Sequence, residues 1–214
     1  MSILVRRVNL GMWKDYCASA ACRRPLISHL FKYPKYSAPG DVITNELNTT
    51  GDALSFWKIS DESEIEDALL AMCTGTSQSN IGTVHYLLFD ERELKSRGIQ
   101  VVQSSNDANT AVTELKKLHH NIVNVDYLTL GRLQDMIVDK IRADKSQCKT
   151  KAKIKPIVKQ AIANEKIDFT ILSNDYIRHL RDDFKDLRNV IPEIKTNSII
   201  CPNCASVISL PLLR

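Results

Sequence analysis

Residues 53–103 alternate between strand-like and helix-like segments, and this alternation constrains the fold more than any other feature of the chain. Three of the segments are short, apolar and rich in residues that favour strands. In the first segment between them, apolar residues recur at the spacing of one buried helical face. This order predicts an α/β fold (or an α+β fold) in which helices accompany a small mixed sheet. The expected strands are Ala53–Ile59, Val84–Phe89 and Ile99–Gln103, with a helix from Ser60 to Gly75 and one or two helical turns at Glu91–Arg97.

The helix after the first of these strands carries clear signals at both ends. Ser60 and Asp61 can cap its first turn, and Glu64 stands three residues after Asp61, which is the spacing of a capping box. Gly75 can adopt the backbone conformation that ends a helix. Elsewhere we expect an edge strand at Ile3–Val8, a loosely helical segment at Gly11–Leu30, and helices at Asn109–His119 and Tyr127–Arg142.

A lysine-rich segment at residues 144–156 is the sharpest break in composition. Five lysines alternate there with polar or small residues, and Pro156 ends the run. We therefore expect an α/β core with a basic N-terminal segment (1–143), a linker (144–156) and a mainly helical C-terminal region that ends in a Cys-x-x-Cys knuckle (157–214).

The C-terminal region contains a helix that we expect to run from Ser173 or Asn174 to about Asn189. Its apolar residues step by three and four in turn, and this spacing gives a narrow seam suited to one partner helix. The pattern predicts that a partner protein binds this seam through Ile177, Leu180, Phe184 and Leu187.

Cys201 and Cys204 form the most specific motif of the chain. Two cysteines separated by two residues, with a proline between them and apolar residues on both sides, suit a knuckle that holds a structural zinc ion. A redox pair would be expected at the start of a helix, where the helix dipole activates a thiol. The flanking residues instead resemble a short hairpin, which favours metal over redox chemistry, and unligated structural thiols are the other reading.

Tetrahedral zinc needs four ligands, and the knuckle supplies two of them. Cys17 and Cys22 are the first candidates for the other two, with His29 and His179 in reserve. Within one continuous helix, Cys17 and Cys22 would point roughly 140° apart, so that helix would have to be broken between them. A zinc ion shared between two copies of the chain is the alternative.

Charge is unevenly distributed along the chain. Residues 1–40 carry +6, residues 41–143 carry −7 and residues 144–214 carry +5, for a net charge of +4. The basic ends either dock on the acidic middle or form a surface that binds anions. For the lysine-rich segment itself, the more usual interpretation is a solvated, flexible tether. If the ends bind a phosphate backbone, the candidate contacts are Lys149, Lys151, Lys153, Lys155, Arg6 and Arg7.

Several classes of protein are disfavoured. No apolar run approaches the roughly 18 residues of a membrane helix, so we expect no membrane association. The first apolar residues precede Arg6 and Arg7, the reverse of a secretory signal, which predicts a cytoplasmic protein. In that compartment the six cysteines are expected to be thiols or metal ligands. No phosphate-binding glycine loop, nucleophile elbow or zinc-protease motif occurs, so we predict no catalytic residue.

One part of the chain resembles a group of bacterial proteins. The segment from Asp41 through Leu54–Ile59 (LSFWKI) to Glu66–Leu69 (EDAL), followed by Asn121–Val123 and Asp126–Tyr127, is similar to small accessory proteins of bacterial multi-gene systems, including those of antiviral (anti-phage) defence. The resemblance covers roughly residues 41–143. It implies a subunit that works beside a larger ATPase or nuclease, and it assigns no catalytic residue.

Two functions are therefore expected. The first is a non-catalytic accessory or scaffold subunit of a larger bacterial complex, which docks a partner protein through its C-terminal region. The second is a zinc-stabilised adaptor that binds DNA or RNA through its basic N- and C-terminal segments.

Overall fold

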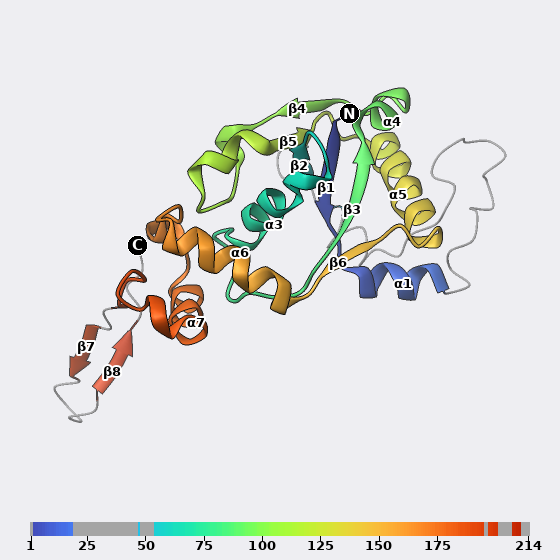
Figure 1. Cartoon of the computed structure of the whole chain (residues 1–214). Helices are drawn as coiled ribbons and strands as arrows, with labels where there is room; N and C mark the ends of the chain where they lie inside the picture. The colour runs from blue at the N-terminus through green and yellow to red at the C-terminus, as the bar shows by residue number, and fades with distance from the viewer. Residues whose placement is uncertain (1, 19–46, 48–53, 195–196, 201–206, 211–214) are drawn as a thin grey trace.

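The computed structural model describes residues 2–18, 47, 54–194, 197–200 and 207–210 (Figure 1). Six strands form one sheet in the order β4-β5-β2-β1-β3-β6, and every neighbouring pair is antiparallel. A sheet with helices is thus confirmed, but it is antiparallel rather than mixed. The strands are β1 (Ile3–Arg7), β2 (Leu54–Ile59), β3 (Val84–Asp90), β4 (Val101–Gln103), β5 (His119–Ile122) and β6 (Gln147–Lys149).

Helices cover both faces of this sheet (Figure 1). One hydrophobic cluster joins α3, α6 and α7 to Val5, Ile59 and Tyr86 of the strands. A second cluster joins α1 and α5 to Leu4 and Phe89 on the other face. The helices are α1 (Leu10–Ala18), α3 (Ile65–Cys73), α4 (Glu91–Ser96), α5 (Tyr127–Arg142), α6 (Lys151–Ala163) and α7 (Asn174–Asp183).

Strand β1 lies in the middle of the sheet, so its assignment as an edge strand was wrong. It pairs with β2 on one side and with β3 on the other. Leu4 and Val5 are fully buried, on opposite faces. Both faces of β1 are therefore covered, which explains why the segment is an apolar run without alternation.

The capped helices match the prediction closely. Asp61 accepts a hydrogen bond from the N–H of Ser63 at 2.8 Å, and a 3₁₀ turn at Glu62–Glu64 leads into α3. Glu64 accepts from the N–H of Ser60 at 2.8 Å, so it caps the residue before Asp61 and not Asp61 itself, as a strict capping box would. Helix α5 has the expected bounds. Its first turn is capped by Asp126, which accepts a hydrogen bond from the N–H of Thr129 at 2.6 Å.

The region 109–122 differs from the prediction. The expected helix is replaced by a 3₁₀ segment at Thr113–Leu118, and the chain then forms β5, which pairs with both β2 and β4. His119 and Asn121 are 2% and 6% exposed. Polar side chains at the buried positions of β5 hide the alternation by which a strand is recognised.

The lysine-rich segment 144–156 is not an extended linker. Residues 147–149 form β6, which pairs with β3, and α6 begins at Lys151 rather than near Pro156. Ile154 and Val158 are fully buried in the cluster that also contains α3. The segment therefore belongs to the folded core.

The C-terminal region ends in a second, two-stranded sheet. Strands β7 (Asn197–Ile200) and β8 (Val207–Leu210) pair antiparallel, with Ile200 opposite Val207. This hairpin lies beyond α7, away from the six-stranded sheet (Figure 1). The short hairpin expected around the Cys-x-x-Cys motif is thus present in its two strands. Within the described residues, no helix is long and apolar enough to span a bilayer.

Candidate functional site: an arginine-lined pocket

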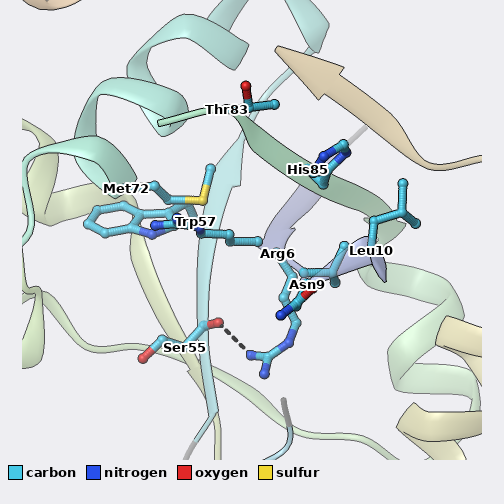
Figure 2. A pocket seen from close by; sticks show the side chains of 10 residues that line it. Arg6, Asn9, Leu10, Ser55, Trp57, Met72, Thr83 and His85 are labelled. Carbon is cyan, nitrogen blue, oxygen red and sulfur yellow. Dashed lines mark hydrogen bonds between the residues drawn. The ribbon is translucent and has the colours of Figure 1, made fainter. Parts of the chain in front are cut away.

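The sheet opens between β1 and β2. The two strands pair over only three positions, from Ile3 opposite Ile59 to Val5 opposite Trp57. If the register continued, Arg6 would lie opposite Phe56 and Arg7 opposite Ser55. Instead, Nη1 of Arg6 donates a hydrogen bond to the Ser55 carbonyl oxygen at 3.1 Å (Figure 2). A side chain thus takes the acceptor that a β-ladder would have used.

The alternation of hydrogen bonds along β1 directs the N–H of Arg7 into this opening. The N–H of Val8 donates to the carbonyl oxygen of His85 on the β3 side at 2.9 Å. Because antiparallel strands alternate their bonding direction, even-numbered residues of β1 bond to β3 and odd-numbered residues face β2. The N–H of Arg7 therefore points into the gap, where Arg6 already holds the Ser55 oxygen.

A cavity of about 560 Å³ occupies the gap. Figure 2 shows several side chains around it, with the thioether of Met72 beside the indole of Trp57. The described residues that line the cavity include two arginines and no aspartate or glutamate. They are Arg6, Arg7, Val8, Asn9, Leu10, Ser55, Trp57, Met72, Thr83 and His85.

The two arginines play different parts in this wall. Arg6 is held in place, because its guanidinium lies 5.2 Å from the centroid of the Phe56 ring in addition to its bond to Ser55. Arg7 is exposed and forms no ion pair with any described residue. Arg7 can therefore turn its guanidinium toward a ligand without breaking a salt bridge.

Two further polar groups reach the cavity. Thr83 accepts a hydrogen bond of 3.4 Å from the N–H of Lys151, so the wall abuts the N-terminus of α6, a 13-residue helix. The positive end of the helix dipole adds to the positive potential there. Nδ1 of His85 is buried and has no hydrogen-bond partner among the described residues. The sequence pointed to Arg6 and Arg7, whereas the other wall residues come together only through the sheet.

The predicted lysines are only partly available to an anion. Lys155 and Lys151 approach Asp183 of α7 at 2.8 and 3.7 Å. Lys149 lies opposite Val84 and Arg7 lies opposite Tyr86, which puts Lys149 and Arg7 on one face of the sheet, two strands apart. Lys153 is exposed. The charge of α6 is therefore partly neutralised inside the molecule.

The predicted zinc ligands fall mainly outside the described residues. Cys22, Cys201 and Cys204 lie outside the described residues. So do residues 19–30 of the segment Gly11–Leu30, which was expected to be loosely helical. Cys17 is on α1, which lies at the opposite end of the molecule from the β7–β8 hairpin (Figure 1). Within the ranges that the structure describes, no three potential ligands cluster. Cys17 is therefore not placed to share a metal with that hairpin in the same chain.

The predicted partner-binding seam is occupied by the chain itself. Ile177, Leu180 and Phe184 are at most 6% exposed, and Leu187 is partly buried against the same cluster. Helix α7 ends at Asp183, and a 3₁₀ turn at Lys185–Leu187 follows. The seam was assigned to a partner in error, because its partners are α3 and α6 of its own fold.

A second polar cavity of about 430 Å³ lies near the opposite end of β2, lined in part by Lys58, Glu64 and His120. Beside it, Glu91 forms ion pairs of 2.8 Å with both Lys58 and Lys95. Hydrogen bonds from Lys58 and Lys95 lower the pKa of Glu91 to about 2, and burial lowers the pKa of His120. This arrangement makes Glu91 a firmly ionised bridge between β2 and α4.

Exposed apolar side chains are few in the described part of the chain. The three large ones are Val102 on β4 and Tyr127 and Leu128 at the start of α5, with Tyr127 80% exposed. Strand β4 is an edge of the six-stranded sheet and contains neither lysine nor proline. An edge without such residues is open to pairing with another strand.

Comparison with known proteins returns no relative. No protein-family model, no curated protein and no solved structure matches this chain.

Proposed function

We propose that the protein is a non-catalytic accessory subunit of a larger bacterial complex, which docks a larger protein, such as an ATPase or nuclease, through its C-terminal hairpin. The pairing of β7 with β8 around the Cys-x-x-Cys motif is the observation that carries the proposal. This role is the one that the resemblance to accessory proteins of antiviral defence systems implies, and the proposal includes a cytoplasmic location.

The hairpin needs support from outside its own two strands. Each strand has four residues, and neither strand contains a charged residue. An isolated two-stranded hairpin is marginally stable in water, so a metal ion, a protein surface or both must hold it. We assign the metal to Cys201 and Cys204, in the six residues that join the strands, as a structural zinc site.

The remaining zinc ligands then come from elsewhere. The partner protein is the source that we favour, because Cys17 lies at the far end of the chain from the hairpin. Of the two reserve ligands, His179 is exposed on α7, and His29 lies outside the described residues. A site completed by the partner would make zinc binding and docking a single event.

Metal content tests the first half of the proposal. We expect one zinc per chain, measured by mass spectrometry on the complex, and loss of that zinc in Cys204→Ser. The matched control is Cys148→Ser, which removes an exposed thiol from β6 and leaves the metal in place. Absence of zinc from the complex would refute the zinc site at Cys201 and Cys204. One zinc per two chains of a dimer would assign the site to two copies of this protein.

Affinity purification from the native host tests the second half. We expect one larger protein to co-purify with the wild type and with Cys148→Ser, and to be lost with Cys204→Ser. The variant Tyr127→Ser/Leu128→Ser alters the exposed apolar residues of α5 instead. If that variant loses the partner while Cys204→Ser retains it, docking occurs at α5 and the hairpin assignment is wrong.

A nucleic-acid-binding adaptor is the second candidate, favoured by Arg7 and Lys149 on one face of the sheet. Duplex DNA binding that weakens steeply with added salt would support it. The pairing of Lys151 and Lys155 with Asp183 reduces the number of phosphate contacts, so we expect a shallow salt dependence.

A further inference from the structure

We infer that the arginine-lined pocket between β1 and β2 binds a phosphate monoester of about nucleotide size. This inference is independent of the docking role proposed for the hairpin. It stands on the cavity, on the charge of its wall and on the peptide group that the splayed strands leave directed into it.

The charge of the wall selects an anion. Arg6 and Arg7 are among the residues that line the cavity, and none of the described lining residues is acidic. A concave site lined by one sign of charge focuses the electrostatic field and concentrates ions of the opposite sign. The N-terminus of α6 at Thr83 adds to the same potential.

The geometry of donors selects an oxyanion with several oxygen atoms. Arg7 offers a planar fork of N–H donors and is free of ion pairs with described residues, while its peptide N–H faces the same gap. Arg6, held by Phe56 and Ser55, adds a second positive charge to the wall of the site. A phosphate group can accept from the guanidinium and the peptide N–H of Arg7 at once.

The volume of the cavity and the apolar side chains in its wall favour an organic phosphate over free inorganic phosphate. The cavity of about 560 Å³ is far larger than one phosphate, and it falls within the roughly 300–1,000 Å³ of small-ligand sites. Trp57 and Met72, which are 7% and 8% exposed, form an apolar side of this cavity (Figure 2). The phosphate therefore lies at Arg7 and the organic part lies against Trp57 and Met72.

Calorimetric titration of the full chain with AMP tests the inference, with adenosine and inorganic phosphate as the partial ligands. We expect AMP to bind, phosphate to compete with it, and adenosine to bind at least about tenfold more weakly, because it lacks the charge-assisted hydrogen bonds. Arg7→Gln should weaken the binding of AMP by about tenfold or more. The matched control is Arg178→Gln, which removes an exposed arginine from α7 and leaves AMP binding unchanged.

A second measurement avoids any variant. In a ¹⁵N-labelled wild-type protein, addition of AMP should shift the backbone amide signal of Arg7 more than those of β4. Equal affinity of AMP for Arg7→Gln, or equal affinity of adenosine and AMP for the wild type, would overturn the inference. Binding of an oligonucleotide without binding of AMP would also overturn it, because the phosphates would then lie on an open surface.

Discussion

A single carboxylate, that of Glu91, connects two elements at the end of the sheet. It lies 2.8 Å from the ammonium groups of both Lys58 on β2 and Lys95 on α4, and its side chain is 12% exposed. These partners lower its pKa from the ordinary 4.5 to about 2. Because the folded state favours the ionised form, Glu91 stabilises the fold above its ordinary pKa, and this contribution is lost as the pH falls toward 2.

We therefore predict that Glu91→Gln lowers the free energy of unfolding at pH 7 by on the order of 1–2 kcal/mol, a value that allows for solvent screening of the two lysines. The difference from the wild type should shrink as the pH is lowered from about 5 to 2, since the wild-type carboxylate becomes protonated. Urea denaturation at a series of pH values measures it. Glu66→Gln, at an exposed position of α3, is the control and should leave the pH dependence unaltered. A constant gap between Glu91→Gln and the wild type across this range would refute the ion-pair account.

Among the elements, α7 shows how a helical seam can be misassigned. Its apolar stripe has the spacing expected of a protein-binding helix, yet Leu180 is completely buried in the cluster that joins α3 and α6. Spacing reveals that a face is covered but not what covers it.

The isolated chain should therefore depend on this seam. We expect Leu180→Ala to reduce the free energy of unfolding by about 2–5 kcal/mol, because it opens a cavity in a filled core. Leu128→Ala, at a position that is 41% exposed, should cost less than about 0.5 kcal/mol. Chemical denaturation of the purified protein compares the two. Equal and small effects would mean that the seam is not packed in solution.

The predictability of each element follows from where its signal lies. Helices α3 and α5 are marked by local capping residues, because Asp61 caps the 3₁₀ turn that leads into α3 and Asp126 caps α5 directly. Strands β5 and β6 have no such mark, because His119 and Asn121 occupy buried positions and β6 consists of Gln, Cys and Lys. Their pairing is decided by the rest of the sheet. The pocket is harder still to foresee, since it depends on where β1 stops pairing with β2.

At the scale of the whole molecule, the first described strand is the centre of the sheet. Strand β1 is flanked by β2 and β3, whereas β4 and β6 form the two edges. Hydrogen exchange reports how often each part of such a structure opens. We predict that the amides of Leu4 and Val5, both fully buried, exchange orders of magnitude more slowly than those of β4 and β6.

Exchange followed by NMR or mass spectrometry on the full chain measures this order of protection. The amides of β3, which also lies inside the sheet, serve as the internal reference. Exchange of β1 as rapid as that of β4 would show that the N-terminal strand detaches from the sheet while the remainder stays folded.

The position of β1 also affects how the protein matures on the ribosome. About 80 residues separate the end of β1 from the end of β3, so at ~5–20 residues per second roughly 4–16 s pass before both neighbours have been synthesised. Ile3, Leu4 and Val5 have no native strand on either side until β2 has been synthesised, and they stay open on the β3 side until the end of the interval. Completion of the sheet is therefore postponed until β1 is captured between two strands that are synthesised later, and chaperones that hold emerging apolar segments should bind β1 before β3 has emerged.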